Sequence, residues 1–100
     1  MIPPSLLDQT VQVESYLGDT AVGPTWGDPV SQRARMQPRR RMVRDREGRE
    51  TVSDATVYLP PETVIGPDDR LTWGGRTYRV MEARPHQMHG RTQYIEAVLG

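Results

Sequence analysis

Apolar and polar residues alternate along several short stretches of this chain, with the period of two that half-buried β-strands show. The stretches are residues 10–14, 30–37, 55–59, 71–73, 76–83 and 92–99. Glycine and proline residues separate most of them, and no segment carries the apolar stripe of an amphipathic helix. The pattern predicts an all-β fold, a small six-stranded antiparallel β-barrel with long loops. A barrel is favoured because closure removes the unpaired edges of a flat sheet.

Two prolines, Pro60 and Pro61, stop the third stretch, since neither can donate a ladder hydrogen bond. Residues 65–69 read Ile-Gly-Pro-Asp-Asp and are predicted to form a turn. In this turn, which includes Gly66, Pro67 presets φ, and the side chains of Asp68 and Asp69 can cap local N–H groups.

A tight hairpin is predicted at Gly74 and Gly75, which supply the positive φ angles that a two-residue type I′ turn requires. Trp73 precedes the turn and Tyr78 follows it. We interpret both rings, with Tyr58 of the third stretch, as core or rim packing.

The chain of 100 residues has room for one core only. Residues 1–9, with their two prolines, are predicted to be an extended N-terminal arm, and residues 10–100 a single β-barrel domain with a charged loop at 39–50. Loops are also predicted at 18–29, where Trp26 stands alone as a large apolar side chain, and at 85–90.

The hydrophobic fraction is 35%, which is low for a chain that must offset the entropy of ordering by burial. We therefore expect copies of the chain or other partners to cover part of its apolar surface. Cysteine is absent, so no disulfide or thiolate metal site is expected. There is no apolar run of membrane-spanning length and no signal-peptide pattern at the N-terminus, so we expect a soluble protein, made inside the cell, without a membrane partner.

The net charge is zero, but its distribution is uneven. Residues 32–49 hold eight arginines against two acidic residues, a net +6, so the remainder carries −6. A flexible loop of this kind can contact a DNA backbone, because guanidinium groups bind phosphates strongly. It can also be solvated, or pair with acidic groups of a neighbouring subunit. The candidate channel- or DNA-facing residues are Arg39, Arg40, Arg41, Arg44, Arg46 and Arg49.

Catalytic signatures are missing from the sequence. The four serines lie near no base in a recognisable pattern, and the adjacent Asp68 and Asp69 are typical of turn caps. We expect no enzyme activity and no cofactor.

One cluster resembles a metal site: His86 and His89, with Glu82 upstream. A structural zinc site needs four ligands, and Pro85 and Gly90 bracket the pair in a way that favours a solvated loop. We expect no metal.

The second half of the chain resembles the head-to-tail stopper proteins of tailed phages, also called head-closure, head-completion or head-tail joining proteins. The resemblance rests on Leu59-Pro60-Pro61, on the turn and hairpin of residues 65–71 and 73–80, and on the terminal strand that ends in Val98-Leu99-Gly100. It covers most of the chain but is concentrated in residues 55–100.

The resemblance implies a virion protein, assembled in the host cytoplasm, that forms a homo-oligomeric ring of six or twelve copies in the phage neck. Its partners would be the portal-adaptor protein above, the tail terminator or tail tube below, and the packaged double-stranded DNA in the channel. In that family the loop between the second and third strands points into the channel and gates it. By position, this loop is residues 39–50 here.

Two other functions remain open. A tail terminator or another neck ring protein shares the small β-rich architecture. A small OB-like nucleic-acid-binding protein would match the barrel and the basic loop, but needs exposed aromatic residues on one face of the sheet.

Overall fold

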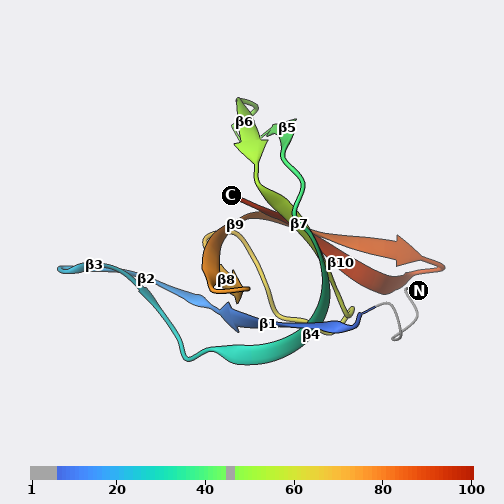
Figure 1. Ribbon diagram of the computed structural model, residues 1–100, viewed down its shortest axis with the longest axis horizontal. Helices are drawn as coiled ribbons and strands as arrows, with labels where there is room; N and C mark the ends of the chain where they lie inside the picture. Colours follow the sequence, from blue (N-terminus) through green and yellow to red (C-terminus); the bar gives the residue numbers. More distant parts are fainter. Residues whose placement is uncertain (1–6, 45–46) are drawn as a thin grey trace.

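Six strands close into an antiparallel barrel in the computed structural model, which describes residues 7–44 and 47–100 (Figure 1). The order around the barrel is β1-β4-β7-β10-β9-β8. The described residues contain no helix, so the predicted all-β, six-stranded barrel is confirmed. The barrel strands are β1 (Gln9–Glu14), β4 (Val30–Gln37), β7 (Ala55–Leu59), β8 (Arg70–Trp73), β9 (Arg76–Met88) and β10 (Arg91–Leu99).

The core is formed by the inward side chains of these strands, and the predicted alternation identifies most of them. Val11 and Val13 of β1 are buried, as are Ala34 and Met36 of β4. Val30 continues the same alternation but is 62% exposed, because the first residues of β4 lie beyond the packed interior. The other core residues are Ala55, Val57, Leu59, Leu71, Tyr78, Val80, Ile95, Ala97 and Leu99.

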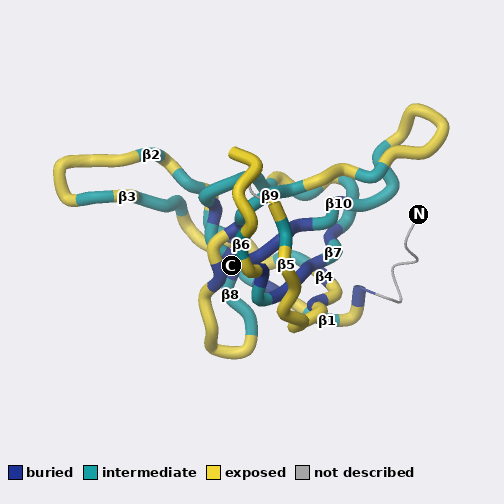
Figure 2. The backbone as a smooth tube through the Cα atoms, turned by 90° about the horizontal axis from the view of Figure 1, so that it is seen from above, coloured by how far each residue is buried: buried dark blue, intermediate teal, exposed yellow. Residues whose placement is uncertain are grey.

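Two additional hairpins project from the barrel (Figure 1). One joins β2 (Tyr16–Thr20) to β3 (Gly23–Trp26), and the other joins β5 (Arg41–Arg44) to β6 (Glu50–Ser53). The paired strands β9 and β10 also extend past the barrel as a ribbon. Figure 2 shows that buried residues gather in the barrel wall, whereas the ends of these hairpins are exposed.

These hairpins correct three predictions. The sequence predicts loops at 18–29, 39–50 and 85–90, yet at least half of the described residues in each range pair in ribbons. The physical reason is that a ribbon which leaves the barrel satisfies its backbone groups by pairing but buries neither face fully. Such a ribbon has no alternating apolar pattern that a sequence reading can detect.

The predicted N-terminal arm, residues 1–9, falls largely outside the described residues, which begin at Leu7. Leu7 is buried, and Gln9 already belongs to β1. No helix in the described ranges is long and apolar enough to span a membrane.

Candidate functional site

The arginine-rich segment forms the β5–β6 hairpin, which leaves the barrel after β4 and returns to it at β7 (Figure 1). Its strands pair from Arg41 opposite Ser53 to Arg44 opposite Glu50. Met42 and Val52, which pair across this ribbon, are both exposed. At its root, the hairpin is positioned by ion pairs and by the buried hydroxyl of Ser53, which donates to the carbonyls of Ala55 and Leu99.

Glu96 provides the first of these contacts from the outer face of β10. Its Oε2 lies 3.3 Å from Nη2 of Arg41, and its Oε1 lies 2.8 Å from Nε2 of His86. The side chain of Glu96 is only 14% exposed, so its carboxylate is well shielded. The His86 ring stacks on Tyr94 with 4.4 Å between centroids, and Tyr94 meets Tyr58 edge to face at 6.0 Å.

For Tyr58 the sequence leaves core and rim packing open, and this cluster excludes the core. Tyr58 lies between the core residues Val57 and Leu59 in sequence, is half-buried, and pairs across the sheet with Arg35 and Glu96. It therefore belongs to the outer face of the barrel. Partial burial and the charge of Glu96 raise the pKa of the Tyr58 phenol above its ordinary value.

Asp54 provides the second contact at the root, from the junction of β6 and β7. Its Oδ1 lies 3.5 Å from Nε of Arg40, and its Oδ2 accepts a hydrogen bond of 2.7 Å from Nη2 of Arg76 on β9. Asp54 thus joins the hairpin root to the β8–β9 turn. The Arg40 side chain is 78% exposed, so its part of the pair is weak.

The arginines further along the hairpin pair within it. Nη1 of Arg44 donates a hydrogen bond of 2.9 Å to the carbonyl of Gly48, and Arg49 forms an ion pair with Glu47. Arg46 lies outside the described residues. The arginine run is therefore divided, with Arg44 and Arg49 engaged inside the hairpin and Arg39, Arg40 and Arg41 at its root.

The predicted turn at residues 65–69 is organised around Asp69, which is buried. Its Oδ2 accepts a hydrogen bond of 2.8 Å from the backbone N–H of Gly66. Its own backbone N–H donates a hydrogen bond of 3.2 Å to the Gly66 carbonyl. Upstream, the N–H of Thr63 donates a hydrogen bond of 3.1 Å to the carbonyl of Pro60. Pro60 and Pro61 therefore begin the corner that leads from β7 into this turn.

The β8–β9 hairpin pivots on Gly74 and Gly75, whose φ angles are +60° and +79°. Trp73 pairs with Arg76 across the turn and packs against the core from one side. Tyr78 is buried, and the Arg76 guanidinium lies 4.6 Å from its ring centroid. This hairpin contacts the root of the arginine hairpin through Arg76, which donates to Asp54.

The sequence predicts that Trp26 stands alone in its loop, but in the structure its ring has several partners. Its Nε1 donates 2.8 Å to the carbonyl of Asp68, its ring lies 6.0 Å from that of Tyr16, and the Arg70 guanidinium sits 3.9 Å above it. These contacts fix the β2–β3 hairpin to the start of β8. Their partners are distant in sequence, so no local signal reveals them.

The residues considered for a metal do not converge. Glu82 binds Arg84 at 2.7 Å, which lowers the pKa of its carboxyl, and His86 is held by Glu96 and Tyr94. His89 lies at the end of the ribbon with a φ of +54°. Within residues 7–44 and 47–100, no three His, Asp or Glu side chains form a group suited to a metal ion.

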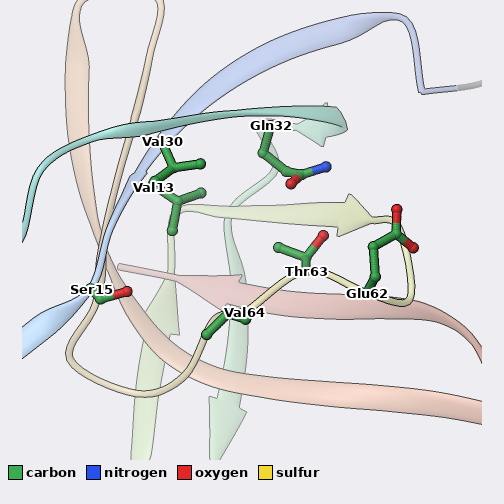
Figure 3. A pocket seen from close by; sticks show the side chains of 7 residues that line it. All are labelled: Val13, Ser15, Val30, Gln32, Glu62, Thr63 and Val64. Atoms are coloured by element: carbon green, nitrogen blue, oxygen red, sulfur yellow. The ribbon is translucent and has the colours of Figure 1, made fainter.

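A pocket of about 280 Å³ lies beside the first part of β4 (Figure 3). Val13, Val30 and Val64 contribute apolar surface to it, and Val64 is 82% exposed. The hydroxyl of Thr63 is buried here without a hydrogen-bond partner. The other lining residues are Ser15, Gln32 and Glu62. Glu62 is the one ionisable group of this set, so the pocket offers no acid–base pair.

Comparison of the sequence with models of protein families and with curated proteins finds no match. The fold and the site define a small closed β-barrel with a projecting arginine hairpin.

Proposed function

We propose that this chain is the head-to-tail stopper of a tailed phage. It forms a ring in the neck that closes the DNA channel after packaging and provides the docking site for the tail. The observation that carries the proposal is the position of the arginine hairpin. It lies between β4 and β7, the second and third barrel strands in chain order, where the resemblance to the stopper family expects the channel gate.

In the ring, copies of the β5–β6 hairpin converge on the axis and obstruct the channel. Their guanidinium groups face the phosphates of the DNA end, while Glu50 allows pairing between neighbouring hairpins. The ion pairs of Arg41 with Glu96 and of Arg40 with Asp54 set the angle at which each hairpin leaves the wall. The proposed function includes no chemical step and no enzyme activity.

Ring formation is supported by apolar side chains that a single copy leaves in water. Val22 is 94% exposed at the end of the β2–β3 hairpin, and Val64 is 82% exposed beside the pocket. Leu17, Val30 and Met88 are also exposed. Neighbouring copies, six or twelve to a ring, would cover such positions, with the portal adaptor above and the tail terminator or tail tube below.

The test is a truncation of the hairpin in the encoding phage. Residues 42–52 are replaced by Asn-Gly, which keeps the Arg41–Ser53 pair and closes it with a two-residue turn. We expect rings that assemble but heads that lose DNA. A second variant, Arg44→Gln with Arg49→Gln, keeps the hairpin length and separates obstruction from charge. Full heads with the truncated hairpin would contradict the gating role.

One observation favours the nucleic-acid-binding alternative. Tyr58, Tyr94 and His86 form an aromatic cluster on the outer face beside Arg41, and base stacking on such rings is common among single-strand binders. Titration with a single-stranded oligonucleotide discriminates the two functions. Binding that is lost in Tyr94→Ala, with no ring at any concentration, would favour the alternative.

A further inference from the structure

A polar cleft lies at the root of the β5–β6 hairpin, distinct from the apolar pocket beside β4. Its volume is about 300 Å³. Gln37 and Thr56 line it and are direct partners at the end of the β4–β7 ladder. The segment that continues from Gln37 supplies the other lining residues, Arg39, Arg40 and Arg41. Three consecutive arginines therefore line one small cleft.

The carboxylates at the root do not balance these charges. Asp54 is shared between Arg40 and Arg76, and Glu96 is shared between Arg41 and His86. With Arg39 included, four guanidiniums face two carboxylates, which leaves an excess of two positive charges. Excess positive charge in a concave site attracts an anion.

The cleft arginines also have donors to spare. A guanidinium has five N–H groups. Arg40 uses Nε toward Asp54, Arg41 uses Nη2 toward Glu96, and Arg39 has no ion pair with any described residue. Paired arginines with free N–H groups suit an oxyanion, which accepts several hydrogen bonds at once.

The end of the hairpin has different surroundings. Arg44 donates one N–H to the Gly48 carbonyl and Arg49 pairs with Glu47, and neither arginine lines the cleft. The concave group of arginines is therefore at the root.

We propose that the cleft of Gln37, Arg39, Arg40, Arg41 and Thr56 binds one phosphate group. That the group belongs to the backbone of channel DNA rests on the proposed function. The phosphate site itself does not, because its chemistry is the same for a free phosphate ion. Occupancy would draw Arg41 between two anions, Glu96 and the phosphate, and so connect ligand binding to the angle of the hairpin.

The experiment uses the full chain and two probes, inorganic phosphate and a 20-base-pair duplex, with the arginine Nε–Hε resonances as the NMR readout. We expect both probes to shift the signals of Arg39 and Arg40. Arg39→Gln removes no ion pair or hydrogen bond with a described residue and should weaken binding of both probes about tenfold. Arg91→Gln, which makes the same charge change on the distant β9–β10 ribbon, should weaken it less than about twofold.

The two sources give different results. If phosphate and duplex both bind and both depend on Arg39, the ligand is a nucleic-acid backbone. If phosphate alone binds, the site stands and the DNA assignment is overturned. If Arg39→Gln and Arg91→Gln weaken probe binding equally, or if neither probe shifts the arginine resonances, the proposed phosphate site in the cleft is overturned. Full DNA retention in phage carrying Arg39→Gln would count against DNA as the ligand of the cleft. It would leave the proposed neck function intact, because truncation of the hairpin tests that function separately.

Discussion

Asp69 accepts a hydrogen bond of 2.7 Å from the backbone N–H of Tyr16, across 53 positions of sequence. The same buried carboxylate accepts from the N–H of Gly66. One side chain therefore closes the turn after β7 and fixes the start of the β2–β3 hairpin. The corner and the hairpin behave as one unit because they share this acceptor.

Asp69→Asn should destabilise the fold by about 2 kcal/mol, since the amide turns one acceptor into a donor that faces an N–H group. Urea unfolding followed by circular dichroism measures the change. Asp28→Asn, at an exposed position, is the control and should leave the midpoint unchanged. An Asp69→Asn midpoint equal to that of wild type would show that the two hydrogen bonds contribute nothing.

The β8–β9 turn should accept Gly74→Asn but not Gly74→Val. The φ of +60° at this position suits asparagine, whereas a β-branched residue is strained there. We expect Gly74→Asn to keep the melting temperature and Gly74→Val to lower it by about 4–8 °C, which corresponds to about 1 kcal/mol in a domain of this size. Equal melting temperatures for the two variants would refute the turn geometry.

Glu96→Gln should loosen the arginine hairpin while the barrel stays folded. The substitution removes the charge that holds Arg41 and His86 at the root. Amide hydrogen exchange of β5 and β6 should become about fivefold faster, equivalent to about 1 kcal/mol, while exchange in β7 is preserved. Glu62→Gln, at an exposed corner residue, is the matched control. Uniform acceleration through all strands would mean that Glu96 serves the barrel and not the hairpin.

The pKa of Glu82 should rise toward its ordinary value of 4.5 in Arg84→Gln. In the native protein the hydrogen bond from Arg84 lowers this pKa. A lowered folded-state pKa means that the pair stabilises the fold above pH 4.5 and that this contribution is lost as pH falls through the folded-state value. An NMR titration of the Glu82 carboxyl carbon measures both proteins. An unchanged pKa would show that Arg84 does not hold the carboxylate in solution.

The parts of the fold that could be predicted are those with a buried face. Val11 and Val13, or Val57 and Leu59, alternate with polar neighbours because one side of each strand is packed, so the barrel was visible in the sequence. The β5–β6 and β2–β3 ribbons bury neither face fully and gave no such pattern. Their charged and small residues predict loops, whereas in the structure the two strands of each ribbon pair with each other.

The candidate site could be predicted only in its local part. The arginine run is evident as a cluster, but its division between root and ribbon depends on Asp54, between β6 and β7, and on Glu96 of β10. Glu96 of β10 contacts His86 of β9 and also Arg41, which is 55 positions away in the sequence. No spacing rule along the chain brings those three side chains together.

We propose that this protein closes the DNA channel and joins head to tail. Electron microscopy of particles that lack only this protein tests this most directly, before and after the purified protein is added back. We predict empty or leaking heads without tails, and recovery of DNA retention and tail joining on addition. Heads that keep their DNA and fail only in tail attachment or tail length would contradict the stopper assignment and indicate a tail terminator. Particles indistinguishable from wild type would contradict both.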